Sequence, residues 1–294
     1  MESHKVVELI PIIGGRAENI SAYNYVASLN HKDLHICSAV ILDKDWLLTA
    51  AHCVVRYRRK KLKVVAGVTD LLHPTIGTKQ ETNVVKIVIH ENYGLKNQSS
   101  VLNNVALIKV QVSLNISTYV GKAKISNIQD EQINRYFLSC RVLGWGSRRE
   151  VNKDEIDFAL EPRKFNNLIS VELYLLPDAL CQKVFSIQKA ENFLCIGTLD
   201  NFYLKCPSDA GSPVICMNMV VGIPSHTTDL CQVILVTRTD LYSNWINNKI
   251  KLHNVSKSYN GREKHITKSC QAYFKLKEYF LHVIVNCFLL HFLY

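Results

Sequence analysis

Leu48-Thr49-Ala50-Ala51-His52-Cys53 is the stretch that decides the fold of this 294-residue chain. Two further segments accompany it, Ile12-Ile13-Gly14-Gly15 near the start and Val142-Leu143-Gly144-Trp145-Gly146 near the middle. Each pattern alone is short enough to arise by chance. The three in this order and at this spacing are specific, and they point jointly to one fold.

Together these segments resemble the chymotrypsin/trypsin-like serine protease family. They are similar to its histidine box, its mature amino terminus and the Gly-Trp-Gly strand that opens its second barrel. The resemblance covers residues 12–250 and implies an all-β protein with a site in the cleft between two six-stranded antiparallel β-barrels. We expect the barrels at about 12–125 and 126–240, after a short propeptide-like segment at 1–11.

The hydrophobic pattern independently favours an all-β fold. Many short β-rich runs, such as Val64–Val68 and Gln232–Thr237, lack a 3.6-residue period and are separated by turn signals. Helical spacing appears at 240–250, where we expect a terminal helix.

The last part of the chain has a different composition. Residues 251–278 are polar and basic, and residues 279–294 are almost wholly apolar. This segment of sixteen residues falls short of a comfortable membrane span, and His282, Asn286 and His291 within it would be costly in hydrocarbon. A membrane anchor, an interfacial helix and an erroneous extension of the gene model remain alternatives, and we favour the last.

Composition limits the class of protein. A hydrophobic content of 48% with 20% charged residues excludes wholesale disorder. The net charge of +10 is compatible with an acidic partner, although it also serves solubility. Nucleic-acid motifs, metal-ligand spacings and phosphate-binding glycine loops are absent from the sequence, so we expect no nucleic acid, no metal and no cofactor.

Cysteines and glycosylation sequons indicate an extracellular protein. Ten cysteines are many for a reducing compartment. The Asn-x-Ser/Thr acceptors are Asn19, Asn97, Asn115 and Asn254. The first residues lack the apolar core of a secretory signal, and we give the cysteines more weight.

The family resemblance also implies a disulfide pattern. It pairs Cys37 with Cys53, Cys140 with Cys216, Cys181 with Cys195, and Cys206 with Cys231. Cys270 and Cys287, both in the tail, have no counterpart in that pattern.

Acyl transfer of this kind needs a nucleophile, an imidazole base and a carboxylate that orients the base. His52 occupies the base position. Asn104-Val105-Ala106-Leu107 stands where the family has Asp-Ile-Ala-Leu, so Asn104 replaces the carboxylate. An asparagine amide can favour the wrong histidine tautomer and cannot stabilise imidazolium. We therefore interpret His52 as a retained buried histidine beside Cys53.

The nucleophile loop is also altered. Ser208-Asp209-Ala210-Gly211-Ser212-Pro213 stands where the family has Gly-Asp-Ser-Gly-Gly-Pro, which puts Ala210 at the position of the nucleophile. Ser208 also replaces a glycine whose amide helps to form the oxyanion hole. Rescue by the hydroxyl of Ser208 or Ser212 is the alternative that we weigh lower.

The resemblance places four residues at the substrate pocket and two at the activation switch. Leu204 takes the place of the floor aspartate, and the walls read Ser225-His226-Thr227 with Ile234 opposite, so we expect a crowded apolar pocket. Ile12 and Asp209 fit the activation pair. Pro11 precedes Ile12 and offers no trypsin-type cleavage site, which predicts a zymogen-like protein.

A basic segment follows the histidine box. Its cations are Arg56, Arg58, Arg59, Lys60, Lys61 and Lys63. They could form an exosite for a polyanion or a solvated charged loop, and both alternatives stay open.

The leading hypothesis is a secreted, non-catalytic serine protease homologue that acts as a binding or regulatory module with protein partners, such as proteases or their substrates. A serine endopeptidase with an unusual active site is the alternative from another class. A version of either that is tethered to a membrane by residues 279–294 is the third.

Overall fold

The structure is a computed structural model that describes residues 15–57, 61–94, 102–126, 138–145, 166–187, 192–198, 210–227 and 233–253. By its internal contacts the chain divides into two units, Met1–Ser243 and Asn244–Tyr294. The first unit contains all the strands described below.

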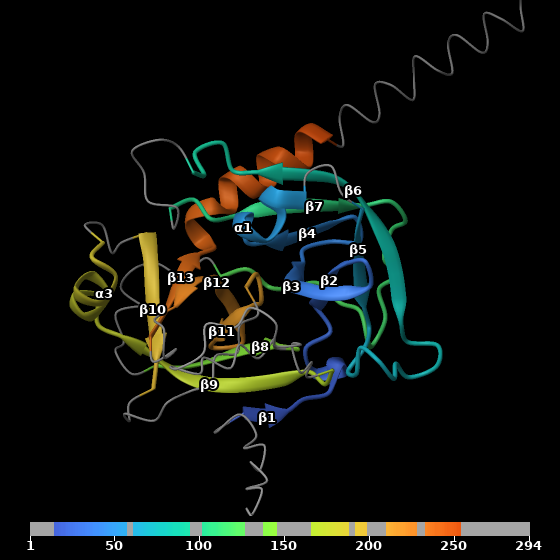
Figure 1. The fold of residues 1–294 in the computed structure, drawn as a ribbon, viewed down its shortest axis with the longest axis horizontal. Helices are drawn as coiled ribbons and strands as arrows, with labels where there is room; N and C mark the ends of the chain where they lie inside the picture. The colour runs from blue at the N-terminus through green and yellow to red at the C-terminus, as the bar shows by residue number, and fades with distance from the viewer. Residues whose placement is uncertain are drawn as a thin grey trace, which may run out of the picture. The chain divides into compact units, whose positions relative to one another are not determined.

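The first half of that unit is a closed antiparallel barrel in the order β2-β3-β4-β7-β6-β5 (Figure 1). Its strands are β2 (Val26–His31), β3 (Leu34–Ile41), β4 (Trp46–Thr49), β5 (Leu62–Ala66), β6 (Gln80–Ile89) and β7 (Ala106–Val110). Leu29, Leu47, Leu48 and Leu107 are fully buried within it.

The second half is a seven-stranded sheet in the order β1-β9-β10-β13-β12-β11-β8, and β8 also pairs with β9. This extra pairing closes a second six-stranded barrel, and β1 is attached outside the ring. The strands are β1 (Gly15–Ala17), β8 (Ser139–Gly144), β9 (Ile169–Leu176), β10 (Phe193–Gly197), β11 (Val214–Cys216), β12 (Met219–Thr227) and β13 (Val233–Arg238). The expected fold class, two six-stranded antiparallel barrels, is confirmed.

The first strand, β1, pairs with a strand of the second barrel. Gly15–Ala17 pairs in register with Ile169–Val171 of β9, so this strand lies on the second barrel although it precedes the first barrel in the chain. The backbone amide of Glu18 extends this contact by donating to the carbonyl of Leu168 over 2.9 Å.

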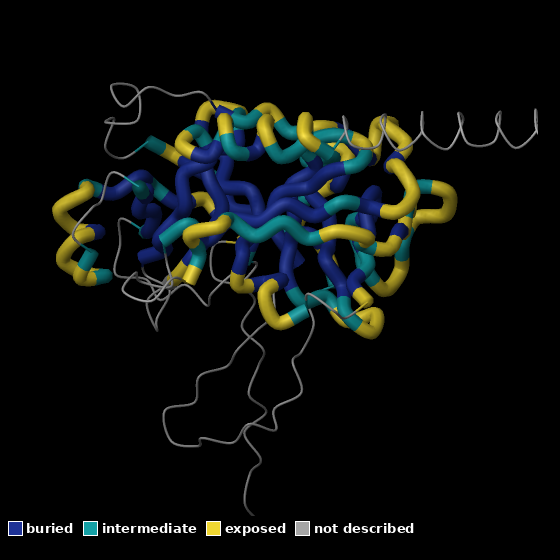
Figure 2. Tube along the Cα trace, turned by 90° about the horizontal axis from the view of Figure 1, so that it is seen from above, coloured by how far each residue is buried: buried dark blue, intermediate teal, exposed yellow. Residues whose placement is uncertain are grey.

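Short turns and β-branched runs explain why these strands form. Lys32 and Asp33 both have positive φ angles, 51° and 61°, and they join β2 to β3 in a two-residue hairpin loop of the kind that matches strand twist. Met217 and Asn218 do the same between β11 and β12. Most buried positions lie in the strands of the two barrels, whereas β1 is exposed along its length and β6 has a single buried residue (Figure 2).

The helices are short. They are α1 (Ala51–Val54), α3 (Asp178–Phe185) and the 3-10 turns η1 (Ile20–Ala22), η2 (Val55–Tyr57) and η4 (Asp240–Tyr242). Residues 243–253 are helical, close to the helix expected at 240–250. None of the helices in the described ranges has the length and hydropathy that crossing a membrane requires.

Candidate active site

The register of β4 and β7 brings His52 and Asn104 together. Thr49 at the end of β4 pairs with Ala106 at the start of β7. Asn104 lies two residues before that pair and His52 three residues after it, so both side chains leave the same end of the two strands. The Cys37–Cys53 disulfide then ties α1 (Ala51–Val54), which carries His52 and is called the histidine turn below, to β3, with the two Cα atoms 6.1 Å apart.

Asn104 is buried, with 1% of its surface exposed, and its side-chain amide makes four polar contacts, one of them from Nδ2 to the carbonyl of Ser225 over 3.4 Å. Its Oδ1 accepts a hydrogen bond of 3.0 Å from the backbone N–H of His52. Its Nδ2 lies 2.8 Å from His52 Nδ1 and donates to Ser225 Oγ over 2.9 Å. The amide therefore joins the histidine turn to β12 of the second barrel.

The backbone of His52 fixes which end of the amide faces the imidazole ring. A backbone N–H can only donate, so the amide group must present its oxygen there and its NH2 to the ring. An NH2 group donates to Nδ1 only when that nitrogen carries no proton. The neutral ring then holds its proton on Nε2, the nitrogen that a general base must keep free.

The surroundings of His52 also favour its neutral form. Desolvation lowers the pKa of His52 below its ordinary value, and the nearby charge of His226 acts in the same direction. A hydrogen bond with Asn104 would raise the pKa only if the amide oxygen faced the ring, which the His52 backbone amide prevents. His52 nevertheless counts as exposed, so the expectation of a buried histidine is wrong, although Nε2 does lie 3.8 Å from Cys53 Sγ.

Ala210 lies beside the histidine turn. Its carbonyl accepts a hydrogen bond of 3.0 Å from the amide of Ser38 in β3, the strand that the disulfide ties to Cys53. Its side chain is a methyl group, which can neither attack a carbonyl carbon nor exchange a proton with His52.

The residues after Ala210 hold the loop against the first barrel. Gly211 has a φ of +79°, and a Cβ at this position would lie 2.3 Å from Thr49 Oγ1 and 2.4 Å from the carbonyl oxygen of Ser38. Ser212 is completely buried, and its hydroxyl has no hydrogen-bond partner among the described residues. The hydroxyl of Ser212 is therefore enclosed by protein and not presented to solvent beside His52.

Two of the pocket residues lie within the described ranges with their side chains. Ser225 on β12 is 9% exposed and contacts Asn104. Ile234 on β13 is 4% exposed and packs in the apolar core of the second barrel, in a cluster with Cys140, Leu173 and Val236. Thr227 is in register with Ile234. Leu204 lies outside the described residues.

The activation pair, Ile12 and Asp209, lies outside the described residues. Three of the four expected disulfides are formed: Cys37–Cys53, Cys140–Cys216 and Cys181–Cys195. Cys206 and Cys231, the fourth pair, also lie outside the described residues.

One cluster has the composition of a metal site. Single ligand atoms of Cys37, His52 and Cys53 lie within 4.8 Å of one another. Both cysteines are bonded in a disulfide and so supply no thiolate, which leaves one nitrogen ligand. This cluster is therefore a poor candidate for metal binding.

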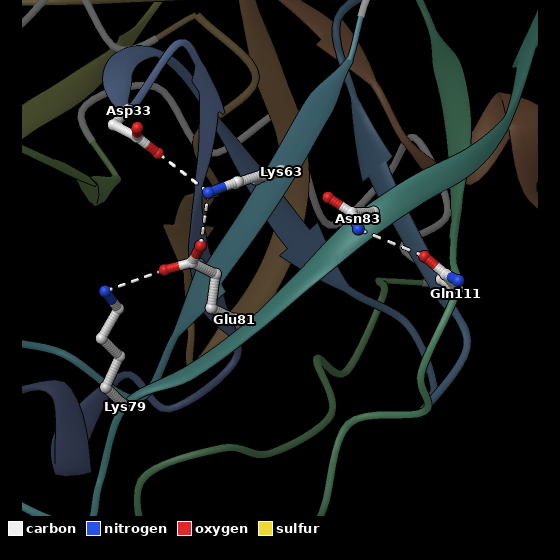
Figure 3. Close-up of polar contacts among 6 residues, drawn as sticks. All are labelled: Asp33, Lys63, Lys79, Glu81, Asn83 and Gln111. Atoms are coloured by element: carbon white, nitrogen blue, oxygen red, sulfur yellow. Dashed lines mark hydrogen bonds and ion pairs between the residues drawn. The ribbon is translucent and has the colours of Figure 1, made fainter.

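The basic segment is only partly available to a partner. Lys63 Nζ lies 3.0 Å from Asp33 and 2.8 Å from Glu81, and Glu81 also pairs with Lys79 over 2.9 Å (Figure 3). The hydrogen bond from Lys63 lowers the pKa of Glu81 and, reciprocally, the pKa of Lys63 is raised. Arg56 and Lys61 are exposed, and Arg58, Arg59 and Lys60 lie outside the described residues.

Sequence reasoning missed two participants in this site. Ser225 was expected as a pocket wall and not as the partner of Asn104, and Ser38 was not singled out. Neither carries a local signal, because each lies far along the chain from the residue that it contacts and meets it only through the fold.

Comparison with known proteins agrees with this geometry. Curated relatives include Trypsin-3 of Salmo salar, 25% identical over 73% of this chain and 81% of its own length. Snake venom serine proteinase 12 of Crotalus adamanteus is 25% identical over 80% of this chain and 85% of its own length. Among solved structures, neuropsin, a serine protease expressed in the limbic system of mouse brain, superposes with a TM-score of 0.66 at 23% identity. That match covers 80% of this chain and 98% of neuropsin, and at this identity it supports the fold alone.

The family model described as Trypsin matches residues 12–246, which include both barrels, the histidine turn and the loop that carries Ala210. The chain therefore belongs to the trypsin family of serine proteases.

Proposed function

We propose that this chain is a catalytically inactive member of its family, which works outside the cell as a binding or regulatory module. The observation that carries the proposal is the orientation of Asn104, whose oxygen is held by the His52 backbone and whose NH2 faces His52 Nδ1. A ring held in this way is a hydrogen-bond donor at Nε2 and not a base.

The size of the defect supports the proposal. Replacing the triad aspartate by asparagine costs about 10⁴-fold in kcat in a serine protease, through the same tautomer effect. Here the nucleophile is absent as well, because position 210 carries a methyl group. With no oxygen to activate, acyl transfer by the usual covalent route has no first step.

A fluorophosphonate probe tests this directly, because it reacts only with an activated serine. We expect no labelling of the wild-type protein, in parallel with an active trypsin that labels under the same conditions. The matched variants are Ala210→Ser, Asn104→Asp and the combination of both. The combination should label more strongly than Ala210→Ser alone, since the carboxylate restores the base.

The alternative function is a serine endopeptidase that uses a neighbouring hydroxyl. It predicts that the wild-type protein labels and that changing Ser208 or Ser212 to alanine abolishes the labelling. Either result would overturn the proposal of inactivity. The complete burial of Ser212 argues against that hydroxyl as the nucleophile.

The extracellular location is part of the proposal, and the disulfides support it. Three bonds of this kind within the described residues are typical of secreted domains. The partners that we propose are proteins, in particular active proteases or their substrates, which a shared fold could engage without cleaving. Affinity capture with residues 12–250, with and without the Asn104→Asp/Ala210→Ser change, identifies partners that depend on the altered site.

A further inference from the structure

Three exposed apolar side chains lie close in sequence to one asparagine of the first barrel. Between β7 and the second barrel, Val112 is 66% exposed, Ile116 51% and Tyr119 39%. All three lie within four residues of Asn115, which is itself exposed. Exposed apolar groups gathered in this way mark a surface that something else covers.

The backbone of this loop is held firmly in place. The side-chain amide of Gln80 donates to the carbonyl of Asn115 over 2.7 Å and accepts from its N–H over 2.8 Å. Leu114 is buried, and its amide donates to the carbonyl of Lys44 over 2.8 Å. Asn24 donates to the carbonyl of Thr118 over 3.2 Å. The apolar side chains are therefore exposed on a fixed surface.

The side chain of Asn115 takes no part in these contacts. Its backbone makes both bonds to Gln80, and within the described ranges no hydrogen bond to its side-chain amide is found. Asn115 begins the sequon Asn115-Ile116-Ser117, whose serine is also exposed. The nitrogen can be modified without loss of any contact that holds the loop.

We propose that Asn115 carries an N-linked glycan and that this glycan covers the apolar side chains of Val112, Ile116 and Tyr119. The sugar donor is a lipid-linked oligosaccharide pyrophosphate. A bond forms between Asn115 Nδ2 and the anomeric carbon, the bond from that carbon to the pyrophosphate oxygen breaks, and Nδ2 gives up one proton. A glycan is bulky and well hydrated, so it keeps such a surface in solution.

Asn19 provides a contrast within the same chain. It is exposed and begins a sequon, but its Oδ1 accepts from the amide of Ser21 and caps η1. Ile20 beside it is buried. A glycan at Asn19 would therefore not be needed to cover Ile20.

The test uses the full chain, directed through the secretory pathway of eukaryotic cells. Peptide mapping after enzymatic deglycosylation in heavy-oxygen water should find aspartate with heavy oxygen at position 115. Asn115→Gln should lose one glycan by gel shift and should lower the fraction that stays soluble on concentration. Ser117→Thr keeps the sequon and should retain both properties.

Asn19→Gln is the matched control for solubility, because it makes the same chemical change beside a buried apolar residue, Ile20. An unmodified Asn115 in the secreted protein would refute the site. An Asn115→Gln protein that remains as soluble as Asn19→Gln would refute the covering role. Probe labelling of the active site is unaffected by either outcome, so the proposed function is judged separately.

Discussion

At the scale of single residues, the site differs from a working triad by very few atoms. Asn104 occupies the space of a carboxylate and keeps contacts with the His52 backbone and with Ser225. Only the direction of the hydrogen bond with the ring is reversed, because the NH2 group of Asn104 donates where a carboxylate oxygen would accept a hydrogen bond from His52 Nδ1. The geometry of the site is thus retained while its proton chemistry is changed.

The tautomer of His52 can be measured. Nitrogen NMR at neutral pH should show His52 protonated on Nε2, and its titration midpoint should lie below the ordinary histidine value of about 6.5. Asn104→Asp should move the proton to Nδ1 and raise the pKa, because a carboxylate stabilises the charged ring.

The lowered pKa of His52 should also make the stability of the protein depend on pH. Because partial desolvation of the ring lowers the pKa of His52 in the folded state, the folded protein prefers the neutral ring. This contribution to stability is present above about pH 6.5 and is lost as the pH falls through the folded pKa. An Asn104→Asp protein whose His52 midpoint moves downward would contradict this account.

Gly211 permits a test of backbone geometry. Gly211→Ala should destabilise the fold through its φ of +79° and also through contact with Thr49 and the Ser38 carbonyl. We expect about 1–3 kcal/mol for the conformational strain alone, measured as a lower midpoint of urea unfolding.

Gly77→Ala is the control, because Gly77 has a similar φ of +82° but a Cβ there would meet nothing within 4 Å. Gly77→Ala should lose the stability that the positive φ costs an alanine, without a further loss from steric contact of the new Cβ. Equal losses for the two variants would mean that the loop at Ala210 can move away from β3.

Residue identity was the part of the site that the sequence could predict. The family resemblance located His52, Asn104 and Ala210, and the structure places these residues at the junction of the two barrels. The exposure of His52 and the bond between Asn104 and Ser225 could not be predicted, since both depend on how β12 lies against the first barrel.

At the scale of elements, the pairing of β5 and β6 changes the character of the basic segment. Lys63 is set beside Glu81 of β6 and beside Asp33 of the β2–β3 hairpin (Figure 3). These carboxylates are 18 and 30 positions away in the chain, so a run of cations gave no sign of them. We propose a polyanion site that relies on Arg56 and Lys61 rather than on Lys63.

Heparin affinity distinguishes these cations. Lys61→Ser should elute at lower salt than the wild-type protein, because Lys61 is exposed and no carboxylate partner is found for it among the described residues. Lys63→Ser removes the same charge but also frees Glu81 and Asp33, so it should shift elution by a different amount.

Removing the carboxylate that pairs with Lys63 and Lys79 should have the opposite effect on elution. Glu81→Gln should raise the salt needed for elution, because it releases Lys63 and Lys79 from their shared carboxylate. Identical elution of all these variants would show that this face does not bind polyanions.

At the scale of the whole molecule, hydrogen bonds join the two barrels away from the side chains of the site as well as through them. Trp145 is fully buried and donates to the carbonyl of Thr69 over 3.0 Å. The amide of Leu168 donates to the same carbonyl over 2.8 Å, and Leu71 donates to Asn166 over 2.8 Å. These bonds hold the second barrel against the first and thereby hold Ser225 against Asn104.

The disulfides should contribute unequally to this assembly. Cys140–Cys216 closes a separation of 76 residues and Cys181–Cys195 one of 14. Loop-closure entropy gives about 4.5 kcal/mol for the longer loop and about 3 kcal/mol for the shorter one. The double-alanine variant that lacks Cys140–Cys216 should therefore lose more unfolding free energy than the variant that lacks Cys181–Cys195. The opposite order would point to strain or to residual structure in the unfolded chain.

The barrels themselves could be predicted from the motifs and the strand patterns, but the attachment of the first strand could not. Gly15–Ala17 has no distinctive composition, and its partner in β9 lies more than 150 residues further along the chain. The sequence of three residues cannot predict that they pair with a strand so far along the chain. The division into barrels at about residue 125 did not anticipate this pairing.

That distant pairing has a consequence for the order in which the protein is made. All strands of the first barrel leave the ribosome before Ile169–Val171 does, so β1 must wait without a partner while the first barrel closes. Pairings at such separation form late, because loop closure precedes any gain in contacts. We therefore expect β1 to dock only after the six strands of the first barrel have paired.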